Sequence, residues 1–263
     1  MNCKICDSKV ENFFKAKILG KYDIQYFRCG NCQYIFTEEP YWLEEAYKQA
    51  INIFDTGIIE RNLNLRKLVS ILIYFFYDRG KKFLDYAGGY GIFTRMMRDV
   101  GFDFYWDDPF CENTLAKGFE YNSSDINSIQ LLTAFEVFEH LVNPVNELEK
   151  MLKISKNIVF STILIPDPLP KPDEWWYYAF EHGQHISFYS KKTLEILAGK
   201  FNLHFYGYKE LFLFTEKKFS RIIFNSVMSL NKIGLFMFVK KLLKSKTMGD
   251  HFYLIKNFKQ FPQ

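Results

Sequence analysis

A glycine-rich turn between two strand-like runs is the feature that most constrains the fold of this chain. In FLDYAGGYGIFTRMMRDVGFDFYWDD, residues 83–108, an apolar run ends at Asp85 and a glycine cluster follows. A helical pattern then covers residues 91–100, and a second apolar run ends at Asp107 and Asp108. Strands that alternate with helices in this way form a parallel sheet with helices on both faces. The segment therefore predicts an α/β domain.

The same alternation continues along the chain. Hydrophobic periodicity predicts strands at 82–86, 102–106, 130–135, 157–162 and about 203–213, and helices at 58–78, 91–100, 144–153 and 190–199. Residues 216–245 have the pattern of two apolar helices flanked by lysines, and DHFYLIKNF at 250–258 has that of a last strand. We therefore expect a cysteine-rich segment at 1–40, a helical connection at 41–80, an α/β core at 81–215, and C-terminal helices with a candidate last strand at 216–263.

Four of the five cysteines form two C-x-x-C pairs that are separated by 22 residues. Two such pairs are typical of a tetrahedral zinc site, although four unrelated buried thiols are the alternative. The residues between the pairs have the pattern of two short strands around Leu19–Gly20, which is the outline of a zinc ribbon. Four thiolates leave no open coordination position, so the predicted zinc is structural. Its predicted ligands are Cys3, Cys6, Cys29 and Cys32; Cys111 stands apart, with no assigned chemistry.

The glycine turn does not match the common phosphate-binding loops. A P-loop needs a lysine and a serine or threonine after its last glycine, but Ile92 and Phe93 follow Gly91. A dinucleotide fingerprint needs a third glycine where Thr94 stands. The carboxylate of Asp85 ahead of the turn would repel a phosphate, whereas it would suit a ligand that carries an amino group and a sulfonium. A structural turn without a ligand remains the alternative.

These motifs resemble those of the class I S-adenosylmethionine-dependent methyltransferases. FLDYAGGYG resembles their motif I, and LLTAFEVFEHLVNP resembles the later strand and the helix after it. WWYYAFEHGQHISFYSKKTLEILA is similar to a segment of the members that modify sugars and other small molecules. An N-terminal cysteine ribbon also recurs in sugar C-methyltransferases and in enzymes of surface-polysaccharide biosynthesis. The resemblance covers residues 1–215 and implies a doubly wound, mostly parallel seven-stranded sheet of the Rossmann-like type, with S-adenosylmethionine as cofactor.

The resemblance implies a role for each position that matches its motifs. Asp85 would face the amino group of the cofactor, the glycines would let the backbone approach its methionyl part, and Asp108 or Asp107 would hold the ribose. Residues 122–127 would lie beside the adenine. Ala87 departs from the motif, since it stands where the family most often has its first glycine; alanine fits there if its φ is negative. The implied cofactor-binding residues are Asp85, Ala87, Gly88, Gly89, Gly91, Asp107, Asp108, Phe135 and Glu136.

The implied reaction is O- or C-methylation of a sugar or of a small molecule linked to a glycan. A base is needed if a hydroxyl, or a carbon next to a carbonyl, must lose a proton. His185 in GQHIS is the preferred base and His140 is the second candidate, because an imidazole titrates near neutrality. A purely structural role is the alternative for either histidine. Glu139, Glu181 and His182 are candidate supporting groups, and Trp175 and Trp176 are candidates for stacking on the acceptor or for ordinary packing.

Charge is distributed unevenly along the chain. The net charge is only +4, which speaks against nucleic acid as a partner. Between Lys200 and Gln263, however, 12 basic and 3 acidic residues give 12 − 3 = +9. This tail fits dimerisation, peripheral contact with an anionic membrane, or simple coverage of the sheet edge. The N-terminus lacks the apolar run of a signal peptide, and no apolar stretch reaches the ~18–20 residues of a spanning helix, so we expect a cytoplasmic protein.

Two other functions fit parts of the sequence. An RNA or protein methyltransferase would use the ribbon to grip a macromolecule, but the ribbon is poorly basic and no N-P-P-Y or D-P-P-Y stretch is present. A non-catalytic zinc-ribbon scaffold would leave the set of cofactor motifs without a purpose.

Overall fold

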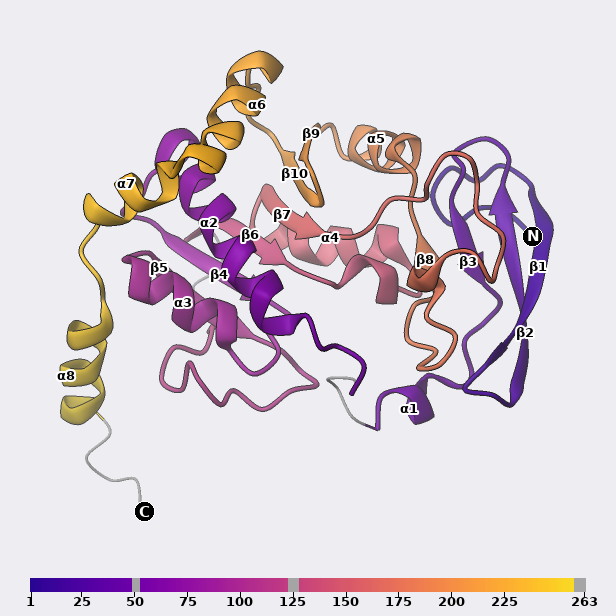
Figure 1. The fold of residues 1–263 in the computed structure, drawn as a ribbon, viewed down its shortest axis with the longest axis horizontal. Helices are drawn as coiled ribbons and strands as arrows, with labels where there is room; N and C mark the ends of the chain where they lie inside the picture. Colours follow the sequence, from indigo (N-terminus) through magenta and orange to yellow (C-terminus); the bar gives the residue numbers. More distant parts are fainter. Residues whose placement is uncertain (49–52, 123–127, 258–263) are drawn as a thin grey trace. The chain divides into compact units, whose positions relative to one another are not determined.

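The computed structural model describes residues 1–48, 53–122 and 128–257. They form two compact units: unit 1 comprises Met1–Phe54 with Ala134–Lys218, and unit 2 comprises Asp55–Thr133 with Phe219–Gln263. Figure 1 labels the helices and strands of both. Each unit combines segments that are distant in the sequence.

Unit 2 contains the glycine turn. Its strands are β4 (Lys82–Tyr86), β5 (Asp103–Asp107) and β6 (Ile129–Ala134), and its helices are α2 (Ile58–Phe76), α3 (Ile92–Val100), α6 (Arg221–Ser229), α7 (Leu235–Lys241) and α8 (Thr247–Asn257). The strands β5 and β6 both pair with β4 in parallel. Parallel pairing brings the carboxyl ends of these strands to one edge, which is where Asp85 and Asp107 lie.

Unit 1 contains the cysteines and the predicted catalytic histidines. A hairpin of β1 (Val10–Ile18) and β2 (Tyr22–Cys29) continues through β3 (Ile35–Thr37) to β8 (Ser187–Phe188) in a four-stranded antiparallel sheet. The predicted turn at Leu19–Gly20 is confirmed, and both of its residues have a positive φ. The remaining elements of unit 1 are α1 (Leu43–Ala46), α4 (Pro144–Ile154), β7 (Asn157–Ser161), α5 (Lys191–Lys200), β9 (His204–Tyr208), β10 (Leu211–Thr215) and the short 3-10 helices η2 (Phe138–His140) and η3 (Trp176–Tyr178).

Several helices begin where local chemistry favours a start. The side chain of Asn143 accepts a hydrogen bond from the Asn146 amide, and Pro144 occupies the first turn of α4. Ser190 and Thr193 form a reciprocal capping box at the start of α5. These caps define the residue at which α4 begins after η2 and the residue at which α5 begins after β8.

The predicted α/β fold is confirmed, with differences in the sheet. The strand order is β5-β4-β6-β7-β10-β9, and β10 runs antiparallel to both β7 and β9, so the sheet is mixed. In the part of the chain that the structure describes, this sheet has six strands rather than seven. The single strand predicted at 203–213 is the hairpin β9–β10, because Lys209 and Glu210 interrupt the apolar run and Lys209 adopts a φ of 54°.

The predicted last strand at 250–258 is wrong. Residues 247–257 form the helix α8, and residue 258 lies outside the described ranges. A run of four apolar residues does not distinguish a strand from a helix. Asp250 favours the helix, because its carboxylate there lies 2.7 Å from both Arg95 Nη2 and Arg98 Nη2 of α3. The Ser245 hydroxyl accepts a hydrogen bond from the amide of Thr247, the first residue of the helix.

Candidate functional site

The glycine turn of unit 2 is tied to the end of β5. The Gly88 amide donates to the Asp107 carbonyl at 3.2 Å, and the Gly89 amide donates to Asp108 Oδ2 at 2.9 Å. The indole Nε1 of Trp106 donates to the Gly89 carbonyl at 2.8 Å. The glycines therefore lie next to the two aspartates. Hydrogen bonds to β5 and to the residue that follows it hold the turn in place.

Two of the glycines are required by the packing of the protein itself. A Cβ atom on Gly88 would lie 2.8 Å from both Asp85 Oδ2 and Trp106 Cδ1. Gly91 has a φ of 82° at the start of α3, and a Cβ there would lie 2.9 Å from Asn113 Oδ1. Steric exclusion by neighbouring side chains therefore explains glycine at both positions, whether or not a ligand is bound.

Ala87 differs from the condition that the sequence imposed on it. Its φ is 53°, in the left-handed region, so the negative φ under which alanine would fit without strain is not met. A residue with a Cβ costs energy in this conformation, and glycine does not. The alanine thus holds a left-handed conformation at the cost of local strain.

Asp85 lies beneath the turn and is only 3% exposed. Its Oδ2 accepts from the Thr94 hydroxyl at 3.0 Å, and its Oδ1 accepts from the Thr133 hydroxyl at 2.9 Å. Burial raises the pKa of the Asp85 carboxyl to about 7, against the opposing effect of the two hydroxyl donors. Sequence reasoning did not identify these threonines, since they lie 9 and 48 residues away. Contact of Asp85 with the cofactor's amino group stays a prediction.

The two aspartates after β5 have different environments. Asp108 accepts three backbone hydrogen bonds, from Gly89, Phe110 and Cys111. The carboxylate of Asp107 makes no hydrogen bond within the described residues, and burial together with the nearby Asp108 raises its pKa. Asp108 therefore shapes the loop, and a role of Asp107 in holding the ribose stays a prediction. Of the predicted adenine loop, residues 123–127 lie outside the described residues.

In unit 1 the segment after β6 is strained at a predicted site residue. Glu136 has a φ of 53°, which is uncommon for a residue with a side chain. The Ser161 hydroxyl fixes this conformation, because it accepts from the Glu136 amide at 2.9 Å and donates to Glu136 Oε1 at 2.6 Å. Phe135 and Glu136 are both partly buried. Strain that a neighbouring side chain maintains is often found at functional positions.

The two predicted catalytic histidines lie together in unit 1. The ring centroids of His140 and His185 are 5.0 Å apart. Nδ1 of His140 lies 3.0 Å from the Gln184 carbonyl oxygen, and Nδ1 of His185 lies 2.8 Å from the Tyr177 carbonyl oxygen. Because a carbonyl oxygen only accepts, each Nδ1 carries the proton and each Nε2 carries the lone pair. Both imidazoles are therefore oriented as bases or as metal ligands.

Glu139 and Tyr177 complete this cluster. Glu139 is fully buried, and its Oε1 accepts from the Tyr177 hydroxyl at 2.6 Å. The Tyr177 ring packs 4.6 Å from the ring of His185, centroid to centroid. Potential ligand atoms of Glu139, His140 and His185 all lie within 4.8 Å of one another. Tyr177 was not among the predicted site residues. The only sequence feature that pointed to it was its position directly after Trp175 and Trp176.

The remaining predicted groups are divided between core and surface. Trp175 is 7% exposed and belongs to the aromatic core of unit 1, so its role is packing. Trp176 is 76% exposed, and its ring lies 5.5 Å from that of Tyr177. His182 packs 4.9 Å from His185, and Glu181 is exposed.

The four cysteines with C-x-x-C spacing form one cluster. Sγ of Cys3 lies 3.5 Å from that of Cys32, and Sγ of Cys6 lies 3.5 Å from that of Cys29. All four thiols are free, and their ligand atoms lie within 4.8 Å of one another. A disulfide would need a separation of about 2.05 Å, whereas zinc bonds of about 2.3 Å to four thiolates place neighbouring sulfurs just under 4 Å apart.

The backbone is shaped alike around both cysteine pairs. The residues after the pairs, Asp7 and Gln33, have φ values of 61° and 66°. Each returns its amide to the carbonyl of the first cysteine in its pair, at 2.9 Å. The Ile5 and Cys32 amides point at Sγ of Cys3 and Cys29, at 3.4 and 3.5 Å. Amides that face sulfur suit thiolates, so the residues present fit a tetrahedral metal ion.

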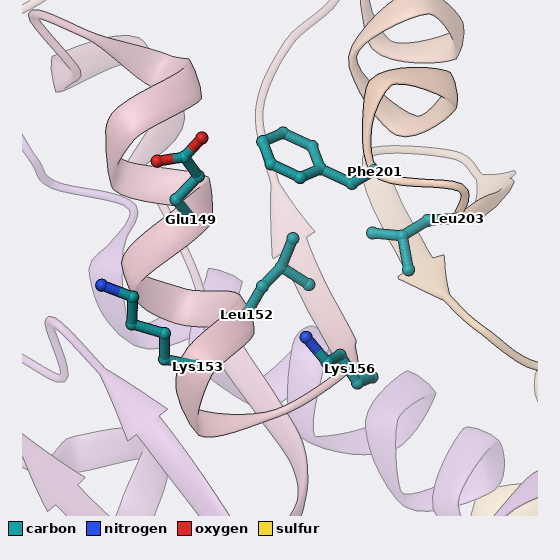
Figure 2. Close-up of a pocket in the computed structure, with 6 residues that line it drawn as sticks. All are labelled: Glu149, Leu152, Lys153, Lys156, Phe201 and Leu203. Carbon is teal, nitrogen blue, oxygen red and sulfur yellow. The ribbon is translucent and has the colours of Figure 1, made fainter.

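Unit 1 also has a surface pocket, which lies apart from the cysteine and histidine clusters. It lies between α4 and the segment that follows α5, as Figure 2 shows. None of the predicted site residues borders it. Its lining residues are Glu149, Leu152, Lys153, Lys156, Phe201 and Leu203.

Comparison with known proteins identifies the family of the chain. Residues 60–206, more than half of the sequence, match the methyltransferase domain family. No match was found among curated proteins.

Solved structures that resemble the chain include three that differ widely from it in sequence. TnmH shares 14% identity, with a TM-score of 0.46 over 67% of this chain and 60% of that one. The plantazolicin methyltransferase BpumL, in complex with SAH, shares 11% identity, with a TM-score of 0.47 over 72% of this chain and 81% of that one. Human N-acetylserotonin methyltransferase, in complex with SAM, shares 14% identity, with a TM-score of 0.45 over 67% of this chain and 66% of that one.

The match thus spans less than two thirds of TnmH and of the human enzyme. The family match covers β4, the glycine turn, both aspartates after β5, and the cluster around His140 and His185. The chain belongs to the methyltransferase domain family.

Proposed function

We propose that the methyl acceptor is a sugar or a glycan-linked small molecule, methylated at a hydroxyl oxygen or at a carbon next to a carbonyl. The observation that carries this proposal is the pair His140 and His185, whose Nδ1 protons are both bonded to backbone carbonyls. Acceptors with a mobile proton need such a base, whereas an acceptor that is already nucleophilic does not. The exposed ring of Trp176, in the same unit, supplies an apolar face of the kind on which sugars stack.

In the proposed reaction His185 Nε2 removes the proton from the acceptor. S-adenosylmethionine, when bound, supplies an electrophilic methyl group on a sulfonium. The acceptor's electron pair would form the new bond to that methyl carbon, and the electrons of the broken C–S bond would stay on sulfur. The Tyr177 carbonyl holds the His185 ring through Nδ1 and stabilises the imidazolium that results. His140 is oriented in the same way and would orient the acceptor.

The cofactor-side roles are proposed from unit 2 alone. Asp107 accepts hydrogen bonds from the ribose hydroxyls, because its carboxylate has no partner within the described residues. Asp108 holds the amides of Gly89, Phe110 and Cys111 and so preserves the shape of the turn. The four thiolates of Cys3, Cys6, Cys29 and Cys32 hold one structural zinc ion.

A variant of His185 tests the proposed base. His185→Asn should retain affinity for S-adenosylmethionine but lower turnover by roughly 10²–10⁴, the usual share of general-base catalysis. The substrates would be nucleotide sugars and sugar phosphates, and the readout would be S-adenosylhomocysteine formation. His251→Asn, a change of an exposed histidine in α8, is the control and should leave turnover unchanged.

Two outcomes would contradict the assignment of His185. Near-normal turnover of His185→Asn would transfer the role of base to His140. Loss of wild-type turnover in chelator, restored by Mn²⁺ or Mg²⁺, would instead make Glu139, His140 and His185 ligands of a catalytic cation, since thiolates do not favour these ions.

A further inference from the structure

Unit 2 exposes an apolar surface on two short helices near its C-terminal end. Exposed large apolar side chains number 22 in the described chain, and 11 of them lie between residues 222 and 255. Ile222 and Ile233 are 79% and 81% exposed, and Phe238 is 58% exposed. We call the part on α6, α7 and the turn between them the α6–α7 surface. Its residues are Ile222, Ile223, Leu230, Ile233, Met237, Phe238 and Leu242.

The buried side chains through which these helices pack are other residues. They are Phe224 and Met228 of α6 and Phe236 and Val239 of α7. The ring of Phe224 packs against that of Phe76 in α2, with centroids 5.6 Å apart and the planes tilted by 48°. The guanidinium of Arg66, also in α2, lies 5.3 Å from the ring centroid of Phe236. The two helices thus already pack against α2, next to which Figure 1 shows them, and the apolar residues of the α6–α7 surface are left exposed.

The segment that carries this surface has charges of a single sign. Residues 217–249 contain eight Lys and Arg residues and no Asp or Glu. Of these, Lys232, Lys240, Lys241 and Lys244 are exposed and alternate along the chain with the apolar residues. An apolar face within a lysine-rich segment is typical of helices that lie in the interface of an anionic bilayer.

We propose that the α6–α7 surface binds the surface of a membrane that contains anionic lipid. The apolar side chains enter the boundary between headgroups and acyl chains, and the lysines contact the lipid phosphates. None of the described helices is individually long and apolar enough to cross a bilayer, although α6 with its following turn and α7 satisfy length and composition together. These two segments are bent by 88° and are short, which suits a position within the interface.

A second copy of the chain is the less favourable occupant of this surface. In a two-fold dimer the same patch faces itself, so the lysines would oppose one another across the interface with no carboxylate in residues 217–249 to compensate them. Anionic headgroups compensate the same lysines directly. The proposal depends on neither the methyl acceptor nor the catalytic base.

Vesicle sedimentation tests the proposal with the full-length chain. The wild-type protein should sediment with phosphatidylcholine vesicles that contain phosphatidylglycerol, and should not do so with pure phosphatidylcholine. High salt should release it, because screening weakens the lysine contacts. Lys240→Gln, Lys241→Gln and Lys244→Gln together should lower the partition coefficient by about 10²-fold, at roughly fivefold for each lysine near the membrane surface.

Matched variants test whether sedimentation depends on the α6–α7 surface itself rather than on any exposed apolar residue or any lysine. Ile233→Ser with Phe238→Ser should abolish sedimentation, whereas Ile59→Ser with Leu115→Ser, which are 52% and 51% exposed elsewhere in unit 2, should not. The triple change Lys156→Gln, Lys192→Gln and Lys200→Gln, at exposed lysines of unit 1, is the charge control. Equal sedimentation of all variants, or no binding to anionic vesicles at low salt, would overturn the proposal. So would a dimer in sedimentation velocity that Ile233→Ser dissociates.

Discussion

Asp85 couples the stability of unit 2 to pH. Its carboxyl has an ordinary pKa of 3.8 when unfolded and about 7 in the fold, because of burial. Between these values the folded state holds a proton that the unfolded state has lost, so the free energy of unfolding falls as pH rises, by up to about 1.4 kcal/mol per pH unit. Asp85→Asn cannot titrate and should show a shallower decrease in urea unfolding followed across this window. Equal pH slopes for the variant and the wild type would contradict the assignment.

Variants of the two aspartates after β5 should differ in their effects on cofactor affinity and on protein stability. Asp107→Ala removes acceptors for ribose hydroxyls, so calorimetry should show S-adenosylmethionine binding weakened by ~1–3 kcal/mol with the melting temperature of the free protein unchanged. Asp108→Ala leaves three backbone amides without their acceptor and should lower that melting temperature as well. Wild-type affinity in Asp107→Ala would refute the ribose assignment.

At the scale of elements, α8 is attached to α3 by a buried ion-pair network. Arg98 is 3% exposed, and its guanidinium contacts Asp250 twice, at 2.7 and 2.8 Å. Asp250→Ala leaves a buried charge with less compensation and should lower the free energy of unfolding by about 3–5 kcal/mol in urea denaturation. The control is Asp99→Ala, which removes a partner of Arg95 that is 44% exposed and should cost less than about 1 kcal/mol. Similar decreases in the free energy of unfolding for both variants would contradict the idea that the burial of the Arg98–Asp250 pair makes its loss more costly.

Sequence alone predicted the elements that local chemistry determines. The helices predicted at 144–153 and 190–199, the strand that ends at the glycine turn, and the hairpin around Leu19–Gly20 all depend on neighbouring residues, and the structure adds the caps at Asn143 and Ser190. The helix α8 was missed because its contacts with α3 join residues about 150 positions apart. Residues around the site were missed for the same reason: Thr133 bonds Asp85 across 48 residues.

For the whole molecule, the chemical roles are distributed over two units. The glycine turn and both aspartates after β5 belong to unit 2, whereas the cysteine cluster and the histidines belong to unit 1. We expect about one zinc ion per chain by elemental analysis, because four thiolates with neighbouring sulfurs 3.5 Å apart fit one tetrahedral ion. Cys29→Ser should lose the zinc and make β1–β3 sensitive to protease, since structural zinc contributes folding energy directly. Calorimetric binding of S-adenosylmethionine should be largely retained, and Cys111→Ser, outside the cluster, should keep its zinc. Protein that is purified without chelator and contains no metal would refute the site.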